Sequence, residues 1–372
     1  MRPFVYDALS GRVVFGAGSF ARADDELDRL GAERVLLIAD RSGSSWADRL
    51  AEALGDRLVA RIDDVLPHVP IESAEAARGL ALDVRADTIV TLGGGSATGL
   101  GKAIALAMPL PILAIPTTYA GSEMTPIWGL TSGARKETGR DLGVQPRTVI
   151  YDPLLTLSLP PSIAGPSGMN ALAHCIEAVY ADGASPVITL MALEGVRILS
   201  SGLPAVVAAP DDIDARADTM AGAYLAGASF AAAGSGIHHK ICHVLGGAYN
   251  LPHAEMHTVV LPHAVAFMTP RAPAAIARIG AALGEDDVAG GLFDLAVRIG
   301  APVDLASIGM PGDRLDEAAD LIAEAARGGP IDVTPAAMRA LLGDAYAGRR
   351  PTAPATSPTL ATPDPLAPPI TA

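Results

Sequence analysis

Aromatic residues and lysine are scarce in this sequence of 372 residues. Phe, Trp and Tyr make up only 4% of a chain that is 50% hydrophobic, so the core must be built from Ala, Val, Leu and Ile. Lysine occurs three times among 27 basic residues, at Lys102, Lys136 and Lys240. Because an ammonium group and a planar guanidinium are not interchangeable, we expect these positions to serve purposes that arginine cannot.

A positive net charge, an export signal and a set of paired cysteines are also lacking. The formal net charge of -14 argues against a nucleic-acid partner, because binding of a phosphate backbone needs clustered Lys and Arg. A small anionic ligand is still allowed, since a site can be locally positive in an acidic protein. No signal peptide, membrane span or disulfide framework is predicted. We therefore expect a cytoplasmic protein without a nucleic-acid or membrane partner.

The first 160 residues alternate between short apolar runs and helical patterns. Strands are predicted at residues 12–19, 34–40, 59–62, 88–96 and 111–118, each of the first four followed by a helix. This alternation indicates a parallel, doubly wound α/β sheet, Rossmann-like, with its ligand crevice at the carboxyl ends of the strands. Residues 161–348 have helical patterns and predict an all-α second domain. Residues 349–372 are dense in Pro, Thr and Ala and predict a disordered tail.

A glycine-rich turn, Gly93-Gly94-Gly95-Ser96, leads from a predicted strand into a helix that contains Lys102. Glycine lets the backbone approach a pyrophosphate closely, and a helix N-terminus offers free N–H groups and a positive dipole end. A plain turn is the competing interpretation, but the strand before it and the helix after it favour phosphate binding. We expect Lys102 to face the same cofactor.

Two other strand ends carry polar side chains. Asp40 ends the second predicted strand, the usual position of an acid that accepts from a ribose hydroxyl, with a helix cap or a turn as the alternative. Arg41 beside it would tolerate a 2′-phosphate. The last predicted strand runs into a group of hydroxyls, of which we expect Thr117, Thr118 and Ser122 to meet the cofactor; a generic turn is the alternative there.

Histidine is concentrated, with seven of eight residues in the helical part of the chain. Asn170 and His174 are spaced four apart, as are His239 and His243, so each pair lies on one face of a helix. His253 returns after a predicted turn. A single histidine is more often a satisfied buried ring, but metal coordination or proton transfer needs a set of this kind.

The order of these motifs is similar to that of a known superfamily. GGGS with a lysine six residues beyond the serine, PTT…GSE, GMNALAH and HxxxHxxGxxxxxPHA…LPH resemble the successive signatures of iron-containing alcohol dehydrogenases, over about residues 1–350. Within it, the maleylacetate reductases are the most similar branch, through GGGSATGLGKAIAL, IPTTYAGSEMTPIWGLT, KETGRD, VIYDPLLT and HHKICHVLGGAYNLPHAEMHTVVLPHA. The resemblance implies a Rossmann-like domain, a helical domain and an active site in the cleft between them.

The resemblance also implies a metal-ligand set, from which this sequence departs. An Asp and three His bind the catalytic divalent metal in the superfamily, and the matching positions here are Asn170, His174, His239 and His253. Asn170 removes the anionic ligand, and Gly99 stands where metal-dependent relatives commonly carry an Asp. Three neutral imidazoles and an amide should bind Fe²⁺ or Zn²⁺ more weakly. Both departures weigh against a metal.

The implied reaction is the reduction of a C=C bond of maleylacetate, a small dianion, to 3-oxoadipate by NADH or NADPH. The expected setting is the breakdown of aromatic compounds, and the expected assembly is a homodimer. Catalytic roles are expected for His243, His253, His239, His174 and Asn170. Cations for the two substrate carboxylates are expected at Lys240, Lys136 and Arg140.

Two other functions stay open. The chain could be a metal-dependent alcohol or aldehyde oxidoreductase of the same superfamily, which metal content and an alcohol-oxidation assay would reveal. It could also be a non-catalytic relative, or one recruited to a biosynthetic pathway. A damaged nucleotide loop is the expected sign of that second alternative, whereas the loop here is intact.

Overall fold

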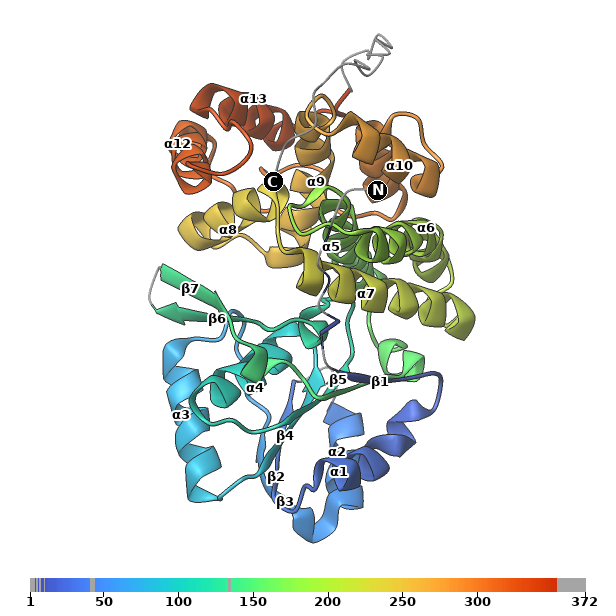
Figure 1. Ribbon diagram of the computed structural model, residues 1–372, viewed down its shortest axis with the longest axis vertical. Coiled ribbons are helices and arrows are strands. Elements are labelled where there is room, and N and C mark those ends of the chain that lie inside the picture. The colour runs from blue at the N-terminus through green and yellow to red at the C-terminus, as the bar shows by residue number, and fades with distance from the viewer. Residues whose placement is uncertain are drawn as a thin grey trace, which may run out of the picture.

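The computed structural model describes residues 4, 6, 8, 9, 11–40, 44–132 and 135–352, which form a sheet domain and a helical domain (Figure 1). The strands are β1 Arg12–Phe15, β2 Val35–Ala39, β3 Leu58–Ile62, β4 Thr88–Gly93, β5 Ile112–Pro116, β6 Ile127–Ser132, β7 Arg135–Arg140 and β8 Thr148–Tyr151. The α-helices are α1 Ala23–Leu30, α2 Ser44–Leu54, α3 Ile71–Asp83, α4 Gly95–Ala107, α5 Pro161–Tyr180, α6 Pro186–Ala208, α7 Ile213–Ala233, α8 Ile237–Tyr249, α9 His253–Met268, α10 Pro273–Leu283, α11 Val288–Arg298, α12 Leu315–Ala326 and α13 Pro335–Tyr346.

Six strands pair in parallel in the order β1-β8-β5-β4-β2-β3. The predicted parallel sheet and helical second domain are therefore confirmed. The direction of the strand order reverses between β2 and β4, and open α/β sheets bind ligands outside the carboxyl ends of the strands at such a point. Asp40 and the glycine turn follow these two strands.

The continuous apolar runs of the sheet are explained by helices on both of its faces. Leu36 and Ile38 of β2 belong to a core shared with α3 and α4, whereas Val35, Leu37 and Ala39 pack with α1 and α2. All five β2 side chains are buried. The alternation thus places one strand in two cores.

The helical domain is built around α5, which is buried along most of its length and packs against α6, α7 and α9. Helix α6 is long and apolar enough to cross a membrane by length and composition alone. It packs against α5 and α7, and its outer face carries the ion pair between Glu194 and Arg197. It is a core helix of this domain.

Two details differ from the predictions. The antiparallel hairpin β6–β7 extends from the sheet domain to α8 and was not predicted. The first residues of the predicted tail also belong to the helical domain, because Arg350 pairs with Asp287 and Asp294 and Pro351 is buried. Residues 353–372 of the tail and Arg41 lie outside the described residues.

Candidate active site

The glycine turn and Asp40 meet at the point where the strand order reverses. The backbone N–H of Gly94 donates to Asp40 Oδ2 at 2.6 Å. A Cβ added to Gly93 would lie 2.2 Å from the same oxygen, so this position must be glycine while Asp40 is present. The carboxylate therefore fixes the turn from the neighbouring strand.

The N-terminus of α4 opens beside this contact. Gly94, its N-cap residue, supplies no side-chain hydrogen bond, and Gly94, Gly95 and Ser96 are half-buried. The N–H of Thr117 donates to the Gly93 carbonyl, and Thr118 lies against Gly94. The predicted cofactor residues Asp40, Gly93, Gly94, Gly95, Ser96, Thr117 and Thr118 are therefore gathered at one edge of the sheet. This edge offers free N–H groups and a helix dipole to a phosphate.

Lys102 does not face this edge, so that prediction is wrong. Its side chain is fully buried, and Nζ donates to the carbonyls of Ser122 and Ile127 at 2.6 and 2.8 Å and to Thr125 Oγ1 at 3.0 Å. Burial lowers the pKa of Lys102 to about 7, although the negative charge of Glu123 acts in the opposite direction. Lys102 holds the segment after β5 in place, and Ser122 is half-buried as one of its acceptors.

The histidines form two groups, one buried and one exposed. On α5 and α8, the buried rings of His174 and His239 stack with their centroids 5.0 Å apart, and both stack on Phe230 of α7. His243 and His253 are exposed and line a cavity of about 320 Å³. Asn170 is buried one turn before His174.

The cavity lies between the domains, because Thr131 of β6 and His68 also line it. Thr131 Oγ1 donates to the His68 carbonyl at 2.8 Å. His68 and Val69 both have positive φ angles, 63° and 50°, which is uncommon for residues other than glycine. His68, the one histidine outside the helical part of the sequence, thus joins the others through the fold.

Glu177 is a site residue that the predictions missed. It is fully buried on α5, and its Oε2 lies 2.5 Å from His239 Nδ1. Glu177 follows His174 by three residues, so the spacing in GMNALAHCIEA already placed it on nearly the same helix face. The predictions also missed His257. Its ring is buried, and the ring centroids of His257 and His253 are 4.3 Å apart.

Two family models match the chain. One described as iron-containing alcohol dehydrogenase covers residues 10–153, and one described as the C-terminal part of the Fe-containing alcohol dehydrogenase family covers residues 165–346. The chain belongs to the iron-containing alcohol dehydrogenase family.

Individual members of this family match over almost the whole chain. It is 50% identical to a maleylacetate reductase of Burkholderia cepacia, over 94% of this chain and 100% of that protein. It is 46% identical to a maleylacetate reductase of Sphingobium indicum, over 94% and 99%. The crystal structure of maleylacetate reductase from Agrobacterium tumefaciens superposes with a TM-score of 0.90 at 44% identity, covering 94% of this chain and all of that one.

The family's metal set does not fit a divalent ion well in this chain. Buried atoms without a hydrogen-bond partner include Asn170 Oδ1, His174 Nδ1 and His239 Nε2, but none of them is anionic. Among the described residues, three ligand atoms within 4.8 Å of one another are found at His238, Cys242 and His257 instead. The donor set expected from the resemblance thus has no anionic member, and its three histidines do not form such a group within the described part of the chain.

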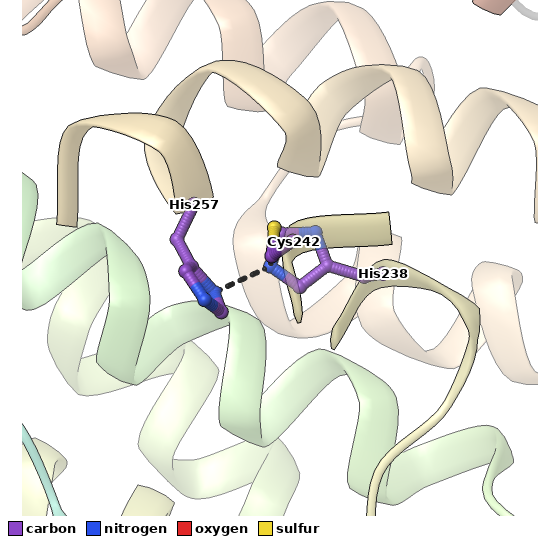
Figure 2. Close-up of side chains that lie close together, drawn as sticks. All are labelled: His238, Cys242 and His257. Carbon is purple, nitrogen blue, oxygen red and sulfur yellow. Dashed lines mark hydrogen bonds between the residues drawn. The ribbon is translucent and has the colours of Figure 1, made fainter. Parts of the chain in front are cut away.

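The side chains of His238, Cys242 and His257 lie close together (Figure 2). Their geometry fits a hydrogen bond between the two imidazoles better than shared coordination of a metal ion. His238 Nε2 and His257 Nδ1 are 2.9 Å apart, a hydrogen-bond distance. Two nitrogens on one tetrahedral zinc would be about 3.3 Å apart, from bonds of about 2.05 Å. The second nitrogen of each ring has no partner, whereas metal-bound histidines usually donate from it.

Two of the three predicted carboxylate-binding cations, Lys240 and Arg140, do not line this cavity. Lys240 lines a different cavity, with Tyr180 and Asp182, and Arg140 is exposed and donates to the Ala231 carbonyl. For these two, the structure contradicts the prediction. Lys136 lies in β7 opposite Thr131, but its side chain is outside the described residues.

The position of Lys102 leads to a stability prediction. Lys102→Met should lower the melting temperature by several degrees, because each buried carbonyl left without a donor costs about 1–3 kcal/mol. Lys102→Arg should not restore the melting temperature, since a planar guanidinium does not match acceptors that are arranged around one ammonium group. Lys240→Met is the matched control and should melt like the unmodified protein in differential scanning calorimetry. An unchanged melting temperature for Lys102→Met, together with lost cofactor affinity, would restore the original prediction.

Proposed function

We propose that the protein reduces the C=C bond of maleylacetate to 3-oxoadipate with NADH or NADPH as the hydride donor. The observation that carries this proposal is identity of 43–50%, over 94% of the chain, to relatives named maleylacetate reductase. The cavity supports it, because histidines of the helical domain lie there beside residues of the sheet domain.

The sheet edge is the proposed cofactor site. The N-terminus of α4 would receive the pyrophosphate, and Asp40 would accept from a ribose hydroxyl. Asp40 disfavours the extra phosphate of NADPH, so NADH is the expected donor. Arg41, the next residue, is the feature of the sequence that favours acceptance of NADPH.

The proposed chemistry is a conjugate reduction. Hydride from the nicotinamide attacks the alkene carbon beta to the ketone, the double-bond electrons shift, and an enolate forms. A proton at the alpha carbon then gives the saturated ketone. The developing enolate oxygen needs a hydrogen-bond donor or a positive charge. His243, with His253 or His239, is the proposed donor. His243 and His253 are exposed in the cavity, whereas His239 is buried, stacks on His174 and has Asn170 one turn before that residue.

The substrate carboxylates need partners other than Lys240 and Arg140. Lys136 stays a proposed cation, because its residue is paired with Thr131 at the cavity wall. The remaining expectations also stay predictions: a homodimer in the cytoplasm that acts in the breakdown of aromatic compounds.

The purified protein is expected to oxidise NADH when maleylacetate is added, followed by the loss of absorbance of the reduced nicotinamide. EDTA should leave the rate intact, because the donor set around Asn170 lacks a carboxylate. The assignment would be overturned by folded protein that oxidises neither NADH nor NADPH. If EDTA abolished the activity and Zn²⁺ or Fe²⁺ restored it, the role given to the histidines would be wrong.

His243→Ala and His253→Ala should each lower kcat by about 10²-fold or more, the scale of a lost general acid. Asn170→Asp should raise metal affinity, measured by titration calorimetry with Zn²⁺, without raising the reductase rate. Retention of full kcat in both alanine variants would exclude these histidines as donors to the enolate.

A further inference from the structure

The side chain of Glu177 reaches from α5 to the start of α8 with no exposure to solvent. Its Oε2 accepts from the backbone N–H of Gly236 at 2.9 Å, and Oε1 accepts from that of His238 at 2.7 Å. Oε2 also lies 2.5 Å from His239 Nδ1. One buried carboxylate thus contacts the first turn of α8 and the imidazole that projects from it.

This contact replaces an ordinary helix cap. Gly236 is the N-cap residue of α8 and has no side chain with which to accept the orphan N–H groups. A Cβ at Gly236 would lie 2.7 Å from Glu177 Oε1, so a Ser or Asp cap there would displace this carboxylate. The carboxylate of Glu177 supplies the cap from another helix, where the positive end of the α8 dipole favours an anion.

The same arrangement fixes the ionisation state of the Glu177 carboxylate. Both carboxylate oxygens accept backbone N–H groups of α8, Oε2 from Gly236 and Oε1 from His238, an arrangement that fits the ionised form. An ionised carboxylate only accepts hydrogen bonds. In the hydrogen bond between Glu177 and His239, the hydrogen is therefore bonded to His239 Nδ1. The other ring nitrogen, Nε2, has no hydrogen-bond partner in the protein.

We propose that Glu177 is the positioning residue of the active site: it holds the His239 ring by Nδ1 and leaves Nε2 for the reacting substrate or cofactor. The stacking of His239 on Phe230 and His174 fixes the ring plane, and Glu177 fixes its rotation within that plane. The catalytic part of this inference rests on the proposed function, because it assigns His239 to the reacting atoms. The tautomer part does not.

The first test replaces the carboxylate by an amide. Glu177→Gln puts an NH₂ group where an oxygen accepted from α8, so at least one of the three contacts is lost. Loss of a group that orients a catalytic histidine costs about 10–100-fold by analogy with metal sites, and we expect kcat to fall by that factor with a smaller change in KM. Glu177→Asp keeps the charge and should recover part of kcat.

Asp152→Asn is the matched control. Asp152 is also fully buried and accepts from three backbone N–H groups, those of Gly18, Phe20 and Leu154, but it contacts no histidine. Both amide variants should have a lower melting temperature than the unmodified protein. Only Glu177→Gln should lose kcat beyond what the fraction of folded protein explains. Equal kcat values in the two variants would reduce Glu177 to a structural cap and overturn the proposal.

A second measurement does not depend on turnover. In protein labelled with ¹⁵N-histidine, the His239 resonance, assigned by its loss in His239→Gln, should show hydrogen on Nδ1. This signal should shift or vanish in Glu177→Gln and persist in Asp152→Asn. If the protein does not turn over maleylacetate but the signal behaves in this way, the proposed function fails while the tautomer assignment stands. An Nδ1 signal unchanged in Glu177→Gln would contradict that assignment.

Discussion

The structure depends on a backbone contact between two glycines, one from each domain. A Cβ at Gly227 of α7 would lie 2.9 Å from the Gly121 carbonyl oxygen, and one at Gly121 would lie 3.3 Å from both Gly227 Cα and His174 Nδ1. Only residues without a side chain allow this approach, and Gly121 also has a φ of 77°. The segment after β5 is thereby held in contact with α7 and with His174 of α5.

Buried charged groups hold this junction together. Lys102 anchors the segment on its sheet side. Arg216 of α7 is fully buried and donates to the carbonyls of Pro210 and Leu159, and Tyr119 beside Gly121 donates its backbone N–H to Ser167 Oγ of α5. A buried charge is tolerated when several partners surround it. Each of these groups therefore serves to fix an element near the site, as Glu177 does for α8.

The fold was predicted well wherever the order of apolar and polar residues in the sequence indicates which side chains are buried. The strands β2, β4 and β5 are apolar runs, and the alternation with helices indicates a parallel sheet. The β6–β7 hairpin was not predicted because its second strand, RKETGR, is charged and lacks the apolar residues that are typical of a strand. Glycines and acids at strand ends were located correctly in space, because carboxyl ends of parallel strands share one edge.

The side chains were harder to predict, because spacing gives a helix face but not what that face meets. Lys240 precedes His243 by one turn, yet the two line separate cavities. Lys102 shares the helix of the glycine turn but points into the protein. Glu177 was overlooked because its partners, Gly236, His238 and His239, are about sixty residues away in the chain and only the fold brings them together.

The central claim is that the sheet edge and the exposed histidines serve one reaction, in which hydride adds to an alkene carbon. Reduction of maleylacetate with NADH deuterated at the transferred position of C4, followed by NMR of the product, tests it most directly. The account predicts deuterium at the carbon that was beta to the ketone and solvent hydrogen at the alpha carbon. Deuterium on the former carbonyl carbon of an alcohol product would show carbonyl reduction instead and would contradict the account.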